Sequence, residues 1–331
     1  ARLVGSEMCI RDRGRALAGE GDHPYRLRTL PADRYAEFRP VGEGGMGLIY
    51  WAVDTDLNRE VAFKVIRADT RGGSSTVAPN RPTDLRPPEG GTDASLSFRS
   101  SKQRFLQEAW ITSAMTHPGI VPVYELGETP EGVPYYTMRF VRGERTLATA
   151  IETAKDQHLD ERLALLEPFL KVCDTLRYAH ARGVLHRDLK PTNIALGDYG
   201  EVVLLDWGLA KLKGTSDPLI EDRLQAHIRA FREAADLRTA ASGMGTPGYM
   251  APEAALGQSD AMDESSDVYS LGAMLFEILT GRLPFEFTTY GELAAQLLKK
   301  DPPRARDIDT LVPEALSDLC ASCLARVKDD R

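Results

Sequence analysis

The stretch from His186 to Asn193 reads HRDLKPTN, and it decides the fold of this chain. It places a carboxylate (Asp188), an ammonium group (Lys190) and a carboxamide (Asn193) on one short loop. Moving the last phosphoryl group of a nucleotide to a hydroxyl needs a proton acceptor, a cation beside the moving group and an oxygen ligand for a divalent metal ion. The spacing therefore indicates phosphoryl-transfer chemistry.

A glycine-rich loop lies upstream and reads VGEGGMGLI from Val41 to Ile49. It fits G-x-G-x-x-G-x-V with Ile49 in the last position, and its glycines let the backbone approach phosphate groups closely. Dinucleotide-binding loops share these glycines but open a helix, whereas residues 48–53 alternate like a strand. The next strand carries VAFK, whose alternation sends Ala62 and Lys64 to one face.

These strings occur in the order GEGGMG, VAFK, HRDLKPTN, DWG and GTPGYMAPE. Over about residues 35–331 they resemble the catalytic domain of bacterial, eukaryotic-like serine/threonine protein kinases. The resemblance implies an α+β bilobal fold. A small lobe at about 35–142 would hold an antiparallel β-sheet and one main helix, and a larger, mostly helical lobe would span about 143–331. A Gly/Pro/Ser/Thr-rich stretch at about 68–101 is expected to be a flexible insertion.

The resemblance implies transfer of the ATP γ-phosphate to Ser or Thr hydroxyls of proteins, in signalling, with Mg²⁺ or Mn²⁺ as the metal ion. Asp188 would be the base, with Lys190 beside it, and Asn193 and Asp206 would hold the metal ion. Lys64 would pair with Glu108. The expected ATP-binding residues are Val41, Gly42, Glu43, Gly44, Gly45, Met46, Gly47, Ile49, Ala62, Lys64, Met138, Arg139 and Val141.

The resemblance also assigns an activation segment to residues 206–253, which is longer than usual for the family. Thr246 is expected to contact Asp188 and Lys190. Trp207 stands where the family has Phe, so its ring needs more room and its indole N–H a partner. Candidate autophosphorylation sites are Thr239 and Ser242, and residues 217–240 show helical periodicity. Two structural roles are expected. Glu253 would form an ion pair with Arg331, and Asp267 would hold the backbone of the segment His186–Asn193, the catalytic loop of the family.

The composition and charge of the chain exclude some classes of binding partner. The chain has 331 residues and a formal net charge of -8, which argues against nucleic acid and anionic membranes. No apolar run approaches the roughly 20 residues of a transmembrane helix. Cys320 and Cys323 form C-x-x-C without a second pair for zinc, so we expect buried thiols and a cytoplasmic location. Residues 1–21 are not included in the predicted fold, because they are expected to be a disordered arm or a translated sequencing adapter.

Three hypotheses of different classes remain at this point. The first is a protein kinase that acts on protein substrates and self-associates for trans-autophosphorylation. The second is a pseudokinase-type module that binds nucleotide or a partner without transfer, although Lys64, Asp188 and Asp206 are all present. The third is a small-molecule phosphotransferase of the same superfamily, disfavoured by the run through Pro252 and Glu253. A magnesium-dependent transfer assay with ATP and a peptide separates them.

Overall fold

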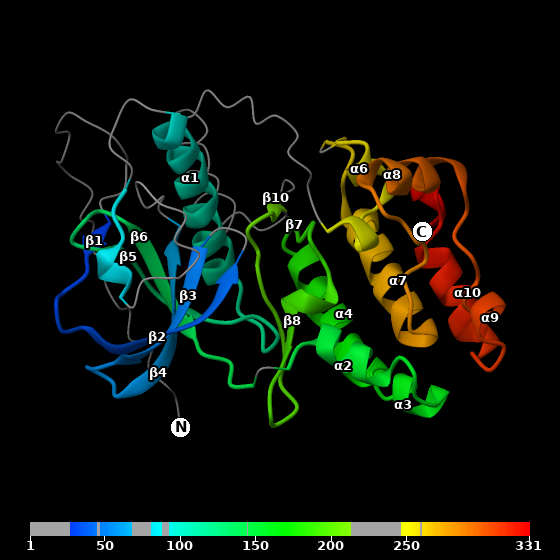
Figure 1. The fold of residues 1–331 in the computed structure, drawn as a ribbon, viewed down its shortest axis with the longest axis horizontal. Helices are drawn as coiled ribbons and strands as arrows, with labels where there is room; N and C mark the ends of the chain where they lie inside the picture. Colours follow the sequence, from blue (N-terminus) through cyan, green and yellow to red (C-terminus); the bar gives the residue numbers. More distant parts are fainter. Residues whose placement is uncertain are drawn as a thin grey trace, which may run out of the picture.

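The computed structural model describes residues 27–44, 47–67, 81–87, 93–143, 145–212, 246–258 and 260–331. Within them the chain forms two lobes that lie side by side (Figure 1). One lobe holds a β-sheet with a long helix beside it, and the other is built mainly from helices. This arrangement agrees with the bilobal fold that the sequence predicts.

The small lobe is a six-stranded sheet in the order β1-β5-β6-β4-β3-β2. Neighbouring strands are antiparallel, except that β1 runs parallel to β5. The strand β3, next to the edge strand β2, alternates between buried and partly exposed residues over most of its length, whereas the central β4 is largely buried. The strands are β1 (Arg28–Thr29), β2 (Tyr35–Gly44), β3 (Gly47–Asp54), β4 (Arg59–Ile66), β5 (Val123–Glu128) and β6 (Pro134–Arg139).

The helix α1 (Asp93–Ala114) packs on this sheet through Phe105, Leu106 and Ala109, all of which are buried. The main helix of the small lobe is expected to follow the flexible insertion at about 68–101, but the helix begins at Asp93, so that insertion does not extend to residue 101. Leu85 also contradicts that insertion, because it is 2% exposed in the core of the small lobe. The polar average composition of a segment predicts disorder, but one large apolar side chain that is buried in the core can still hold such a segment in place.

Two further differences concern short elements. The strand β1 and the buried Leu30 precede the predicted domain start at residue 35, and two residues are too few to show a periodicity. The helical pattern in the sequence of residues 163–182 corresponds to α4 (Leu166–His180), and a separate short helix, α3 (Leu159–Leu163), precedes it. Pro168 lies in the first turn of α4, where its missing N–H leaves no intrahelical bond unmade.

The larger lobe is organised around α7 (Glu264–Thr280). Asp263 caps its start in a capping box, and Gly281 ends it with a φ of +73°. Other helices surround it: α2 (Leu147–Ala154), α6 (Pro252–Ala255), α8 (Tyr290–Lys299), α9 (Ala305–Ile308) and α10 (Glu314–Cys323). The 3₁₀ turns are η1 (Pro82–Asp84), η2 (Pro191–Asn193), η3 (Pro247–Tyr249) and η4 (Lys328–Asp330).

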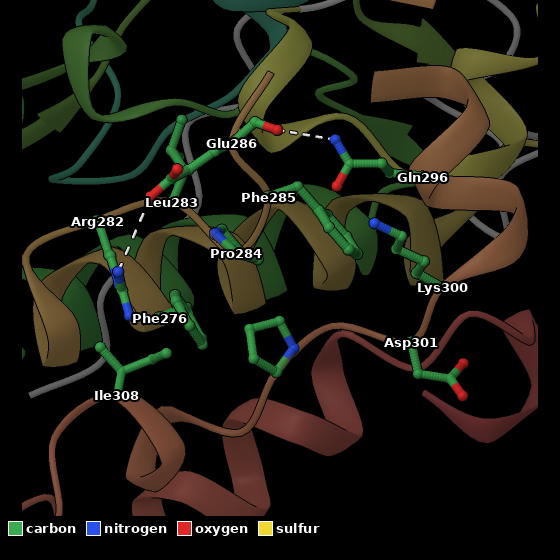
Figure 2. A pocket seen from close by; sticks show the side chains of 11 residues that line it. Phe276, Arg282, Leu283, Pro284, Phe285, Glu286, Gln296, Lys300, Asp301 and Ile308 are labelled. Atoms are coloured by element: carbon green, nitrogen blue, oxygen red, sulfur yellow. Dashed lines mark hydrogen bonds and ion pairs between the residues drawn. The ribbon is translucent and has the colours of Figure 1, made fainter. Parts of the chain in front are cut away.

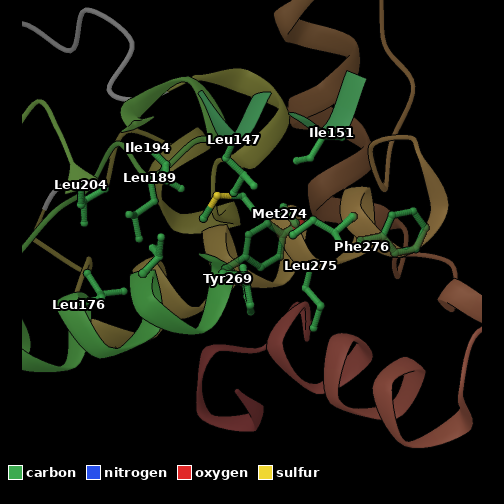
Figure 3. Close-up of a cluster of buried hydrophobic side chains, with 14 of the residues drawn as sticks. Leu147, Ile151, Leu176, Leu189, Ile194, Leu204, Tyr269, Met274, Leu275 and Phe276 are labelled. Carbon is green, nitrogen blue, oxygen red and sulfur yellow. The ribbon is translucent and has the colours of Figure 1, made fainter. Parts of the chain in front are cut away.

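The catalytic loop packs on the hydrophobic core of the larger lobe. Leu189, a residue of that loop, is 2% exposed and joins the same apolar cluster as Leu176 of α4 and Met274 of α7 (Figure 3). Two short antiparallel pairs flank the loop. They are β7 (Val184–Leu185) with β10 (Lys211–Leu212), and β8 (Ile194–Leu196) with β9 (Val202–Leu204). The loop is therefore held at both ends by strands and in the middle by a buried leucine.

No helix in the described ranges is long and apolar enough to cross a membrane.

Candidate active site

The expected ion pair between β4 and α1 is present. Lys64 Nζ lies 2.6 Å from Glu108 Oε1, and both side chains are at most 4% exposed. Removing two charges from water is costly, so such a pair is maintained only where the surrounding groups compensate. The pair holds one ammonium group at a defined point on the inner face of the sheet.

Tyr136 of β6 is part of the same constellation, although the sequence did not single it out. Its hydroxyl donates to Glu108 Oε1 at 2.8 Å, and Lys64 Nζ lies 5.7 Å from the ring centroid. Burial is the main reason that the pKa of Tyr136 is well above its ordinary value, with the charges of Glu108 and Asp206 adding to it. The alternation of side chains along a strand could have pointed to Tyr136, because it places Tyr136 on the same face of β6 as Met138.

Asp188 is surrounded by three of the predicted residues. Lys190 Nζ donates to Oδ2 at 2.8 Å, while the backbone N–H and hydroxyl of Thr246 donate to Oδ1 at 3.0 and 3.2 Å. Asn193 Nδ2 donates to the Asp188 carbonyl at 2.9 Å. The expected contact of Thr246 with Asp188 is therefore present, whereas Thr246 and Lys190 bind different carboxylate oxygens of Asp188 and form no hydrogen bond with each other in the described part of the chain.

Asp267 holds the catalytic loop from α7, as the sequence predicted. Its Oδ2 accepts the backbone N–H of His186 at 2.9 Å and lies 2.8 Å from His180 Nε2. Its Oδ1 accepts the backbone N–H of Arg187 at 2.9 Å. Arg187 has a φ of +70°, a conformation that costs free energy for a residue with a Cβ. A buried carboxylate with these three contacts stabilises that turn.

Asp206 and Trp207 follow β9 at the base of the cleft. Asp206 has a φ of +60°, so its backbone is also strained. Trp207 is 1% exposed, donates its indole N–H to the Leu204 carbonyl at 3.3 Å and packs on the His186 ring at 4.7 Å between centroids. The extra room and the indole partner that Trp needs in place of Phe are both present.

A cavity of about 180 Å³ joins these elements between the lobes. It brings together three predicted residues of the nucleotide site that lie far apart in sequence, Lys64, Asn193 and Asp206. Its full lining is Glu43, Ile49, Lys64, Glu108, Thr112, Val121, Tyr136, Met138, Thr192, Asn193, Leu205, Asp206 and Trp207. Thr112, Val121, Thr192 and Leu205 were not predicted, because isolated side chains of these types carry no motif.

One part of the cleft is lined by apolar side chains, among them Val121 and Met138. Met138 and Val141 pack against the buried cluster of Val121, Ala195 and Val203. Ala62 is 5% exposed and pairs in register with Met138 across β4 and β6, beside Arg139. Of the predicted glycine loop, Gly45 and Met46 lie outside the described residues. Val41 is half exposed, and a Cβ on Gly42 would have nothing within 4 Å.

The oxygen atoms of Asp206 and Asn193 are suitable ligands for a magnesium ion. Asp206 offers carboxylate oxygens, and Asn193 Nδ2 faces Asp188, so Asn193 Oδ1 remains to bind a cation. Mg²⁺ is usually held by one or two such protein ligands, with phosphates and water completing its octahedron. Among the described residues no group of three or more His, Cys, Asp or Glu side chains could hold a metal ion by itself. The set therefore suits a metal ion that arrives with a nucleotide.

Glu253 and Arg331 form the second predicted ion pair. Arg331 donates to Glu253 Oε1 at 2.7 Å and to Oε2 at 3.0 Å, and Ser266 Oγ adds a hydrogen bond of 2.6 Å. Burial opposes ionisation of Glu253, but the hydrogen bonds from Arg331 and Ser266 lower its pKa below the ordinary value. This pair ties Glu253, at the start of α6, to Arg331, which follows η4. Residues 213–245, with Thr239 and Ser242, lie outside the described residues.

A second cavity of about 380 Å³ lies beyond the end of α7, between Phe285, Lys300 and Ile308 (Figure 2). Its charged side chains have mixed signs, with Arg282 paired to Glu286 at 3.9 Å. None of the predicted site residues lines it. The cleft between the lobes is therefore the candidate site.

The chain is similar to known kinases. A family model described as protein kinase domain matches residues 93–331. Serine/threonine-protein kinase PknD of Protochlamydia amoebophila (strain UWE25) is 35% identical over 89% of this chain and 28% of its own length. PknD of Chlamydia trachomatis serovar D is 33% identical over 90% of this chain and 30% of its own length. PknD of Chlamydia pneumoniae is 37% identical over 76% of this chain and 25% of its own length.

This chain thus spans less than a third of the length of these relatives. The matched residues 93–331 contain the catalytic loop, Asp206 and Glu253. The family model agrees with the two-lobed fold, and its match begins after the glycine-rich loop and VAFK. The chain belongs to the protein kinase domain family.

Proposed function

We propose that this chain is a serine/threonine protein kinase that transfers the γ-phosphate of ATP to Ser or Thr hydroxyls of proteins. The observation that carries the proposal is the meeting of Lys64, Asn193 and Asp206 in one cleft, with Asp188 hydrogen-bonded to Asn193 at its rim. Separate strands, loops and lobes contribute these groups. Packing alone gives no reason for them to converge.

The proposed roles follow from the geometry. Lys64, held by Glu108, binds the α- and β-phosphates, and the apolar end of the cleft accepts adenine. Asp206 and Asn193 would hold a magnesium ion, which would supply positive charge to neutralise the phosphates. Asp188 orients the acceptor hydroxyl and takes its proton. The Thr246 hydroxyl, 3.2 Å from Asp188 Oδ1, supports this role because it shows that a threonine hydroxyl can reach the carboxylate.

The test is a transfer assay with γ-labelled ATP, magnesium and a serine-rich test protein such as casein. We expect labelled phosphoserine or phosphothreonine from the wild-type chain and none from Lys64→Met, whose side chain keeps its length but loses its charge. Lys171→Met is the matched control, since Lys171 is 45% exposed and pairs with Glu167 on the surface. Nucleotide binding without transfer would instead indicate a scaffold module.

We also infer trans-autophosphorylation between two copies of the chain. Mixing active wild type with inactive Lys64→Met tests this directly, since phosphate on the inactive copy requires transfer between molecules. Phosphosite mapping would decide whether Thr239 and Ser242 are acceptors. We assign the activity to the cytoplasm because the Cys173 and Cys320 thiols are largely buried, and burial raises their pKa to about 11 and about 12. Such protonated core thiols suit a reducing compartment.

A further inference from the structure

Tyr136 lies at the back of the cleft and is 2% exposed. Its hydroxyl donates to Glu108 Oε1 at 2.8 Å, and this is the oxygen that also accepts from Lys64 Nζ at 2.6 Å. The other oxygen, Oε2, is buried without a hydrogen-bond partner within the described part of the chain. The position of the carboxylate is therefore set by two donors that converge on one atom.

Both donors come from the sheet, whereas the acceptor comes from the helix. Lys64 on β4 and Tyr136 on β6 are register partners across the antiparallel pair, so the sheet backbone fixes the spacing between them. Glu108 lies on α1. A shift or rotation of α1 that carries Glu108 away therefore separates it from the Tyr136 hydroxyl and from the place where Lys64 now binds it.

The two donors differ in stiffness. Lysine carries its ammonium group on four flexible methylene groups, so it can follow a carboxylate that moves. Tyrosine has a rigid ring with two side-chain torsions. The Tyr136 ring is held further by Phe105 of α1, whose centroid lies 5.1 Å away. The phenol therefore defines where the carboxylate sits, and the ammonium group is held relative to it.

We propose that Tyr136 is a positioning residue that fixes Glu108 and through it holds the Lys64 ammonium group where the nucleotide phosphates bind. The inference rests on the proposed function, because it presumes that Lys64 binds phosphate. Tyr136 does not act on the reacting atoms. Because its pKa is raised, the phenol remains a neutral donor at working pH. A phenylalanine would fill the same space, so the hydroxyl is the group whose contribution needs testing.

The experiment compares ATP and adenosine as ligands of Tyr136→Phe by isothermal titration calorimetry. Adenosine has no phosphates and does not reach Lys64, so it reports on the shape of the cleft alone. We expect ATP to bind about three- to tenfold more weakly, the range for losing part of a hydrogen bond to a charged group. Adenosine affinity should stay within twofold of wild type.

Tyr135→Phe is the matched control. Tyr135 is the preceding residue on the opposite face of β6, and its ring stacks on Phe63 at 4.6 Å between centroids. Both ligands should bind this variant as they bind wild type. Equal loss of ATP and adenosine affinity in Tyr136→Phe, or ATP affinity within twofold of wild type, would overturn the inference. Failure of the wild-type chain to bind ATP would instead contradict the proposed function.

A second comparison covers the case in which Tyr136→Phe does not fold. Combining Tyr136→Phe with Glu108→Gln removes the buried charge that would otherwise lack its second donor. If Tyr136 acts through Glu108, the double variant should bind ATP as Glu108→Gln does, because the interaction that the phenol supports is already lost. A further drop in ATP affinity by the full factor would show that Tyr136 acts independently of Glu108 and would reject the inference.

Discussion

Replacing Arg331 by methionine tests how much the buried ion pair with Glu253 stabilises the larger lobe. The Arg331 side chain is fully buried, and it donates to both carboxylate oxygens of Glu253 and to three main-chain carbonyl oxygens. Methionine keeps most of the length and the apolar contacts but donates no hydrogen bond. The carboxylate of Glu253 would stay buried, with Ser266 as its side-chain donor.

Breaking a buried pair by removing one partner costs about 3–5 kcal/mol. At about 2–4 °C per kcal/mol for a large domain, we expect the Tm to fall by about 6–20 °C near neutral pH. The native pKa of Glu253 is lowered, so its stabilising contribution is present above the unfolded pKa of about 4.3 and is lost as the pH falls through the native value. The difference between Arg331→Met and wild type should therefore shrink below about pH 4.

Thermal unfolding followed by circular dichroism, at neutral pH and again well below pH 4, measures both effects. Arg306→Met is the control, because the Arg306 guanidinium is 43% exposed and lies 3.7 Å from Glu314. A surface pair of this kind contributes about 0–1 kcal/mol, so the Tm of the control should change little. The reasoning is refuted if Arg331→Met melts within about 2 °C of Arg306→Met at neutral pH.

Three further predictions concern the catalytic loop and the core. Asp188→Asn should lower turnover by about 10²–10⁴-fold with little change in ATP affinity, measured by steady-state kinetics and calorimetry; near-wild-type turnover would remove Asp188 from the mechanism. Gly119→Ala should destabilise by about 1–3 kcal/mol, since its Cβ would lie 2.0 Å from Thr175 Oγ1, and adding Thr175→Ala should restore most of the Tm if that clash is the cause. Trp207→Phe removes the indole hydrogen bond to the Leu204 carbonyl and leaves a small void, so its free energy of unfolding in urea should fall by about 1–3 kcal/mol; an unchanged value would show that the site relaxes around phenylalanine.

Much of the fold could be predicted from local patterns. The strand β3 (Gly47–Asp54) starts and ends within one residue of the alternating stretch 48–53, because alternation is a local signal. The start of α1 was wrong because residues 93–101 contain little apolar surface, and the helix there continues one that is anchored further along. The two-residue β1 depends on its partner β5, so no local pattern reports it.

For the candidate site, motif order was sufficient to name residues that the structure brings together. Lys64 and Glu108 are 44 positions apart, and Glu253 and Arg331 are 78 apart, yet both expected pairs are present. Tyr136 was missed because a tyrosine in a strand is ordinarily core. Its hydroxyl became informative only when the structure placed it against Glu108.

The sequence by itself determined the chemistry of the site, because residue types and their spacing in HRDLKPTN, VAFK and DWG specify which acids, bases and amides are available. The tertiary structure alone decided how those groups share partners. Lys64 and Tyr136 meet on one oxygen of Glu108, and Thr246 and Lys190 take different oxygens of Asp188. Hydrogen bonds form only within narrow limits of distance and angle, and tertiary packing within each lobe sets these between residues that are far apart in the chain.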